Sequence, residues 1–231
     1  MGLNLYSKIE PFLDFQDEVY NLHNEFMSIV FDKELDNILD VGCGQGFFIE
    51  SLNLNQKKAY GIDLSSEQIE ACKQRGVENV ACIDLKDVKE KYDCATAIFD
   101  VINYIPKDSL KEFFENVYKA LNDKGYFIFD VNTLYGFEEI AQGCITMDLD
   151  DKFIAIDAIY EDEKLVTDLT LFTKLEDGNF KKENDFITQY YHSKDRLKKM
   201  LKKIGFEVES LRDFNLHSDE KPDKQIYICT K

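Results

Sequence analysis

The chain has 231 residues, of which 44% are hydrophobic and 32% charged, so it can fold around a sizeable core. Its formal net charge is −17, and because nucleic-acid binding depends on cations that neutralise phosphates, this balance argues against DNA or RNA as a partner. The six cysteines form no Cys-x-x-Cys pair and the three histidines are scattered, so no metal site is predicted.

The expected location is the cytoplasm. Free cysteines are typical of a reducing compartment, and the sequence shows no signal peptide. No apolar run approaches the length of a membrane span, so no membrane partner is expected.

The first half of the chain alternates between strand patterns and helix patterns. Residues 15–31 carry apolar side chains at helical spacing and predict an amphipathic helix. Residues 37–41 predict a short strand that leads into a glycine-rich segment. Ser65 and Gln68 form a helix-capping pattern. Further strands are predicted at residues 59–62, 80–83, 94–99 and 126–131.

This alternation predicts a parallel sheet with crossover helices on both faces. Such sheets bind ligands beyond the carboxyl ends of their strands. Acidic residues fall at or near the ends of all five predicted strands: Asp40, Asp63, Asp84, Asp100 and Asp130. They predict a polar rim above an apolar sheet.

After residue 142 the pattern changes to antiparallel strands. Residues 153–160 and 165–175 alternate apolar and polar side chains, and Asp177-Gly178 is a hairpin signal before a further strand near 186–191. We expect an inserted antiparallel sheet that serves either as a lid or as a dimer interface. The chain then returns to a helix, ended by Gly205, and to two last strands.

The glycine-rich segment narrows the choice of ligand. Gly46 comes one residue earlier than the third glycine of the NAD fingerprint. Asp63 lies 21 positions after Gly42 (63 − 42 = 21), close to the roughly 20 expected of an acid that holds ribose hydroxyls. Asp40, just before the glycines, suits an amino group or a sulfonium better than a diphosphate, which favours S-adenosylmethionine over NAD.

Four segments resemble, in order, the motifs of class I S-adenosylmethionine-dependent methyltransferases. They are residues 38–46 (ILDVGCGQG), 60–65 (YGIDLS), 81–85 (ACIDL) and 92–100 (YDCATAIFD). The chain also resembles small bacterial methyltransferases that carry Asp-x-x-Asn-Tyr after the fourth strand, Phe-Asp-x-Asn after the fifth, and an antiparallel lid insertion. The matching segments here are residues 100–104 and 129–132.

The resemblance implies an α/β fold: a doubly wound, mostly parallel Rossmann-like seven-stranded sheet with an antiparallel β insertion after the fifth strand. Residues 1–34 would form an N-terminal helical cap. Residues 35–142 and 193–231 would form the S-adenosylmethionine-binding domain, and residues 143–192 the inserted lid. The N-terminal segment could close over the cofactor, with Tyr6 reaching in, or could pack along the sheet edge.

The resemblance also implies which residues meet the methionine end of the cofactor. Gly42, Gly44 and Gly46 would bring the backbone close to the methionine and ribose, and Cys43 lies among them. Asp40 would help to hold the amino-acid end.

The adenosine end is implied in the same way. Asp63 would accept hydrogen bonds from the two ribose hydroxyls, and Leu64 would pack beside the adenine. Asp84 would accept from the adenine amino group, while Leu85 would donate its backbone amide.

The remaining candidates lie toward the acceptor. Phe99 and Asp100 would line the floor near the sulfonium, and Asn103 and Tyr104 are the leading catalytic candidates because they follow the fourth strand. His192 could be a general base, since imidazole titrates near neutral pH, although a capping or surface role is the alternative.

The predicted function is methyl transfer from S-adenosylmethionine, with S-adenosylhomocysteine as product, to a small-molecule acceptor by in-line attack. Alternatives are a protein or RNA substrate, a non-catalytic module that binds the cofactor or a partner, and an aminopropyl transferase. The sequence leaves open the acceptor, the methylated atom and the choice between monomer and homodimer.

Overall fold

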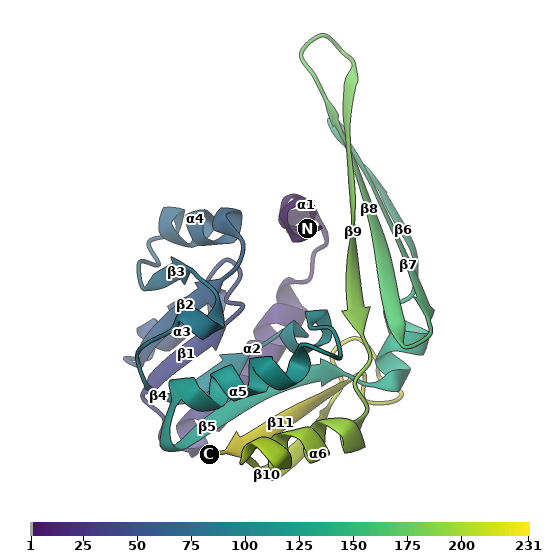
Figure 1. Ribbon diagram of the computed structural model, residues 1–231. Helices are drawn as coiled ribbons and strands as arrows, with labels where there is room; N and C mark the ends of the chain where they lie inside the picture. The colour runs from purple at the N-terminus through teal and green to yellow at the C-terminus, as the bar shows by residue number, and fades with distance from the viewer. Residues whose placement is uncertain (1) are drawn as a thin grey trace.

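The computed structural model describes residues 2–231, so the prediction for Met1 lies outside the described residues (Figure 1). Its main sheet has seven strands in the order β10-β11-β5-β4-β1-β2-β3. The strands are β1 Asn37–Val41, β2 Lys58–Asp63, β3 Val80–Cys82, β4 Tyr92–Ala97, β5 Leu121–Asn132, β10 Glu207–Phe214 and β11 Lys224–Thr230. Strands β1 to β5 pair in parallel, whereas β11 runs antiparallel to β5 and β10. The predicted doubly wound sheet is confirmed.

Helices cover both faces of this sheet because successive strand residues point to opposite sides. Phe127 and Phe129 of β5 pack against one helical layer, while Ile128 between them packs against the other. The first layer contains α5 Leu110–Ala120 and α6 Lys194–Ile204. The second contains α2 Gln16–Asp32, α3 Phe47–Leu54 and α4 Ser66–Gln74.

The start of α4 follows the predicted capping pattern. Ser65 is the N-cap residue, and its side chain accepts a hydrogen bond from the Gln68 backbone amide at 3.3 Å. This contact satisfies one of the free amides of the first turn and fixes the start of the helix directly after Asp63.

The inserted segment forms a separate four-stranded antiparallel sheet, as predicted. Its strands are β6 Gly143–Asp148, β7 Lys152–Glu161, β8 Lys164–Lys174 and β9 Phe180–Tyr190. We call this sheet the insertion sheet. The β8–β9 hairpin extends well beyond the rest of the molecule (Figure 1).

The N-terminal helix α1, Leu3–Ile9, lies between the insertion sheet and α4 (Figure 1). Leu5 and Ile9 pack on the inner face of the insertion sheet. On the other side, Asn4 Nδ2 donates to Glu67 Oε1 of α4 at 3.0 Å. Helix α1 therefore bridges the two parts of the molecule, whereas α2 belongs to the helical layer on the main sheet.

Four short turns of helix complete the structure. They are η1 Glu10–Phe12, η2 Leu85–Asp87, η3 Val101–Tyr104 and the π-helical turn η4 Gly136–Ile140. Among residues 2–231, no helix has the length and hydropathy needed to cross a membrane.

Candidate active site

A cavity of about 2010 Å³ lies over the carboxyl ends of the parallel strands. The glycine turn, Asp63 and η2 line one part of it, and α1, η3 and the inner face of the insertion sheet line the other. Binding pockets for a single small molecule usually hold roughly 300–1,000 Å³. The cavity therefore has room for two ligands side by side.

The glycine turn is held in a conformation that side chains rarely adopt. Gly42, Gly44 and Gly46 have φ angles of 74°, 51° and 77°. A Cβ atom at Gly42 would lie 2.7 Å from Val101, whereas one at Gly44 would meet no atom within 4 Å. Gly44 thus presents bare backbone to open space in the cavity, as close approach of a ligand requires.

Asp63 ties this turn to the start of α4. Its carboxylate accepts hydrogen bonds from the backbone amides of Gly44 at 3.0 Å and Ser65 at 2.8 Å. The side chain is half-buried and lines the cavity. It lies at the end of β2, where an acid that holds ribose hydroxyls is expected.

Asp40 lies deeper, at 3% exposure. Thr96 Oγ1 donates to its carboxylate at 2.7 Å. Burial outweighs this hydrogen bond and raises the pKa of Asp40 to about 7. A cation nearby would favour the charged form of this carboxylate.

The other predicted cofactor residues also line the cavity. Cys43 is buried, and its thiol and that of Cys72 both donate to the Gly44 carbonyl, at 3.9 Å and 3.1 Å. Leu64 is 64% exposed, which leaves its side chain accessible for packing against an adenine ring. Asp84 accepts from the Lys86 backbone amide at 3.0 Å and caps η2, which begins at the buried Leu85.

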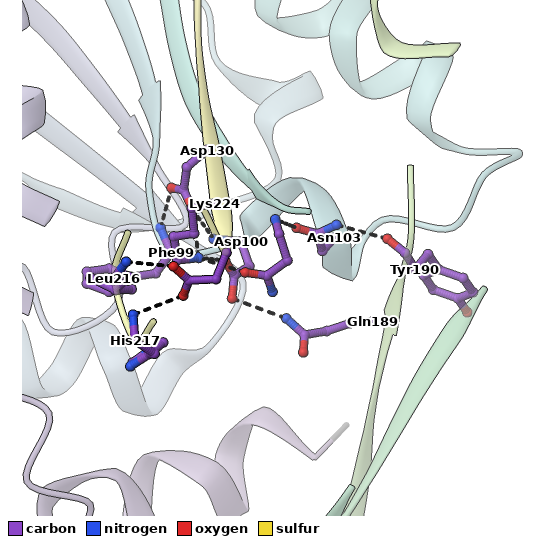
Figure 2. A network of polar contacts seen from close by, with 11 residues as sticks. Phe99, Asp100, Asn103, Asp130, Gln189, Tyr190, Leu216, His217 and Lys224 are labelled. Carbon is purple, nitrogen blue, oxygen red and sulfur yellow. Dashed lines mark hydrogen bonds and ion pairs between the residues drawn. The ribbon is translucent and has the colours of Figure 1, made fainter. Parts of the chain in front are cut away.

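The floor of the cavity contains two consecutive left-handed residues. Phe99 and Asp100 have φ angles of 61° and 64°, which are costly for side chains other than glycine. The buried carboxylate of Asp130 accepts hydrogen bonds from both backbone amides, at 2.8 Å from Phe99 and 3.2 Å from Asp100 (Figure 2). Asp130 thereby holds the backbone in this shape.

Lys224, the first residue of β11, completes this arrangement. Its side chain is 3% exposed and forms ion pairs with Asp100 and with Asp130, the latter at 3.0 Å (Figure 2). Burial lowers the pKa of Lys224, but the two carboxylates outweigh burial and raise it overall. Burial raises the pKa of Asp130 despite Lys224, while the attraction of Lys224 overcomes burial and lowers the pKa of Asp100.

Asn103 is fully buried and does not line the cavity. Its Nδ2 donates to the Tyr190 carbonyl of β9 at 2.9 Å, and its Oδ1 accepts from the Asn132 amide at 3.0 Å. Gln189 Nε2 also donates to Asp100, at 3.4 Å (Figure 2). These contacts favour a role for Asn103 in tying the insertion sheet to the floor, rather than the predicted contact with an acceptor.

His192 is likewise buried and outside the cavity lining. Its Nε2 lies 3.2 Å from the Ile102 carbonyl and 3.1 Å from the Ile105 carbonyl. Burial lowers the pKa of His192 to about 4. The ring is thus placed to fix the loop around η3, and this geometry does not favour the predicted role as a base.

Tyr104 does line the cavity, together with Tyr6 of α1 and Glu10 of η1. Burial and the nearby Glu10 and Asp100 charges raise the pKa of Tyr6. Burial, Tyr6 and the same two carboxylates raise the pKa of Tyr104. Glu10 accepts a hydrogen bond from Gln45 Nε2 of the glycine turn at 3.2 Å.

Sequence patterns did not single out Glu10 or Lys224. The residues around Glu10 indicate only the start of a helix, and those around Lys224 only the start of a strand. The one available signal for Lys224 was a lysine two positions before the apolar strand residues 226–229.

A family model described as a methyltransferase domain matches residues 18–211. The chain belongs to this methyltransferase family. An uncharacterised protein of Methanocaldococcus jannaschii is 30% identical over 224 residues, covering 91% of this chain and 79% of that protein. A solved S-adenosylmethionine-dependent methyltransferase from Clostridium acetobutylicum superposes with a TM-score of 0.80 at 22% identity, covering 98% of each chain.

A second solved methyltransferase adds a ligand to the comparison. CalS10, an amino pentose methyltransferase from Micromonospora echinaspora solved with bound S-adenosylmethionine, superposes with a TM-score of 0.70 at 12% identity, covering 100% of this chain and 97% of CalS10. The prediction of a class I S-adenosylmethionine-dependent methyltransferase is confirmed.

The residues present fit this cofactor. The bare backbone at Gly44 leaves open space, and Asp63 stands beside it. The Gln68 Oε1 atom, on a residue that lines the cavity, is buried without a hydrogen-bond partner among residues 2–231. An unpaired buried oxygen is costly, and a polar ligand would satisfy it.

Proposed function

We propose that this methyltransferase methylates a small-molecule acceptor by in-line attack on the sulfonium methyl of S-adenosylmethionine. The observation that carries the proposal is the continuous cavity of about 2010 Å³, which joins the glycine turn to a second chamber under the insertion sheet. CalS10 acts on an amino pentose, which is a small acceptor of the kind that such a chamber could hold.

The bound cofactor supplies a methyl group that is already activated by its sulfonium. The protein's task is therefore alignment in a site shielded from water. We assign the methionine end to Asp40, Cys43 and the three glycines of the turn. The adenosine end falls to Asp63, Leu64, Asp84 and Leu85, and the floor to Phe99 and Asp100.

The second chamber is the part of the cavity that lies between α1, η3 and the insertion sheet. Tyr6 of α1, Tyr104 of η3 and Ile187 of β9 line it from three sides. Helix α1 is fixed to both neighbours, by Asn4 to α4 and by Leu5 to the insertion sheet. We therefore assign residues 143–192 as a lid, and the N-terminal segment as the part of the wall that closes over the cofactor.

Calorimetric titration with S-adenosylmethionine, S-adenosylhomocysteine and NAD tests the cofactor site. We expect binding of the first two and none of NAD. Asp63→Ala should weaken S-adenosylhomocysteine binding, whereas Asp177→Ala, at the turn between β8 and β9, should leave it unchanged. Absence of binding by all three ligands would overturn the proposal and favour the non-catalytic alternative.

Product formation tests the acceptor class. S-adenosylhomocysteine release can be followed by mass spectrometry with panels of small amines, alcohols and acids, and with a protein and an RNA mixture as comparison. Release only with the protein or RNA mixture would contradict a small-molecule acceptor.

A further inference from the structure

The charges around the second chamber select among acceptors. Lys86 and Lys224 are the lysines that line the cavity, and no arginine does so among residues 2–231. Lys86 is paired with Asp84 at the adenosine end. Lys224 is paired with two carboxylates, Asp100 and Asp130. His23 and His217 also line the cavity, but burial lowers the pKa of His23 to about 4, and His217 Nδ1 lies 3.9 Å from Glu18. No lysine or arginine in the described lining is left over to receive an anionic acceptor.

Negative charge, by contrast, is in excess here. One ammonium faces two carboxylates in the Lys224 cluster. Glu10 adds a further carboxyl group, which accepts a hydrogen bond from the neutral side-chain amide of Gln45. Charges in a partly buried cavity interact more strongly than charges in bulk water, so this excess disfavours carboxylate or phosphate ligands.

Two hydroxyl groups in the same chamber are also free to bind a ligand. Tyr6 and Tyr104 line the cavity, and neither hydroxyl has a hydrogen-bond partner within the described part of the chain. Glu10 and Asp100 line the same cavity, and burial together with their charges raises the pKa of both hydroxyls. Polar groups at a protein's interior normally find partners, so a ligand is the natural partner for these.

We propose that the acceptor is an amine that enters as its ammonium ion and is held by the Glu10 carboxylate and the hydroxyls of Tyr6 and Tyr104. This inference rests on the proposed function and names its substrate class. An ammonium supplies the positive charge that the chamber lacks and donates up to three hydrogen bonds.

Glu10 has a second task in this arrangement. The nitrogen of an ammonium has no free electron pair, so one proton must leave before the nitrogen can be methylated. The proton moves from the ammonium to a Glu10 carboxylate oxygen, which leaves a neutral amine and a neutral carboxyl group. Burial raises the pKa of Glu10, which makes its carboxylate a better proton acceptor than an exposed glutamate.

Three probes of matched shape test the charge preference: benzylamine, benzyl alcohol and benzoate. Each is titrated into protein saturated with S-adenosylhomocysteine, so that the amino group of the cofactor product already occupies its own partners. We expect benzylamine to bind at least tenfold more tightly than benzoate. Equal or tighter binding of benzoate would overturn the inference while leaving the proposed function intact.

Two variants test whether Glu10 causes the preference for benzylamine. Glu10→Gln should weaken benzylamine binding at least fivefold and change benzyl alcohol binding less than twofold. Glu112→Gln, an exposed position elsewhere on the cavity lining, is the matched control and should change neither. An equal loss in both variants would mean that the diffuse charge of the cavity, and not Glu10, attracts the amine.

The tyrosines give a measurement that does not depend on Glu10. Because their hydroxyls have no partner among residues 2–231, Tyr6→Phe and Tyr104→Phe should leave the unfolding temperature unchanged and weaken benzylamine binding severalfold. Unchanged benzylamine affinity in both variants would remove the hydroxyls from the site. If S-adenosylhomocysteine itself fails to bind, the proposed function fails, and this inference fails with it.

Discussion

Replacement of Lys224 by methionine tests the charge cluster under the floor of the cavity. Methionine keeps most of the length of the lysine stem but removes the ammonium that pairs with Asp100 and Asp130. The two carboxylates and the amide oxygen of Asn132, 3.0 Å from the Lys224 Nζ, would then lose a shared partner. Their side chains would remain buried against one another.

Breaking a buried ion pair by removing one partner costs about 3–5 kcal/mol, because the other charge stays desolvated. A domain of this kind has a total unfolding free energy of about 5–15 kcal/mol, so Lys224→Met should lose a large fraction of it. The exposed Lys198→Met is the matched control and should change the unfolding free energy by no more than about 0.5 kcal/mol.

The loss of unfolding free energy in Lys224→Met should depend on pH. Without the ammonium, burial and mutual repulsion raise the pKa of Asp100 and Asp130 in the folded state above the unfolded value of about 3.9. The folded variant then holds protons that the unfolded chain releases, so its stability falls as pH rises through this window. Urea unfolding at pH 5 and pH 7.5 should show the larger deficit at pH 7.5.

Two results would refute this reasoning. One is a deficit below about 1 kcal/mol at pH 7.5, which is no more than an exposed pair would give. The other is a deficit that is equal at both pH values. Adding Asp130→Asn to Lys224→Met should recover part of the stability lost at pH 7.5, since it removes one of the two buried carboxylates that have lost their ammonium partner.

Three further outcomes follow from the site. Asp63→Ala should weaken S-adenosylhomocysteine binding more than tenfold in calorimetry, since two charge-assisted hydrogen bonds contribute about 1.5–3 kcal/mol each; unchanged affinity would remove Asp63 from the ribose site. Because a cationic ligand favours ionised Asp40, S-adenosylmethionine affinity should rise as pH passes through about 7 and level off above it. In Asp40→Asn that rise should be lost, and a rise of equal size would assign it to another group. Asn103→Ala should spare cofactor affinity but lower turnover, because it releases the Tyr190 carbonyl of β9; the reverse pattern would place Asn103 at the cofactor.

The fold of the first half could be predicted because its signals are local. Apolar runs of strand length, a glycine turn and the Ser65 cap each depend on residues within one turn or strand. The insertion sheet was predicted less completely. Its β7–β8 turn falls in the gap predicted between residues 153–160 and 165–175, although it is made without glycine by Asp162 and Glu163, whose φ angles are 51° and 60°.

Strand β6 and the first half of β9 were not predicted as strands from the sequence. Residues 181–185 are charged or polar, and most of them are exposed on both sides of the sheet. Such a segment lacks the alternation that marks a strand with one buried face. It is a strand because it pairs with β8, a property of the hairpin rather than of its own sequence.

The site shows the same division between local and distant causes. Asp40 and Asp63 could be predicted to line the cavity because strand ends meet at one edge of a parallel sheet. Lys224 reaches Asp100 across 124 positions of sequence, through the antiparallel pairing of β11 with β5. The orientation of Asn103 depends on packing, which its residue type does not reveal. The sequence therefore predicted a catalytic role, whereas the structure gives Asn103 hydrogen bonds to the backbone of Tyr190 and Asn132.

The distant contacts explain how a costly floor can persist. Each left-handed non-glycine residue costs about 1–3 kcal/mol, and Phe99 and Asp100 are consecutive. Asp130 offsets this cost by accepting both backbone amides, and Lys224 makes it possible for Asp130 to stay charged while buried. Gln189 of the insertion sheet binds the same Asp100. The last strand and the insertion sheet thus both hold the floor in place, which connects the shape of the predicted cofactor site to the position of the insertion sheet.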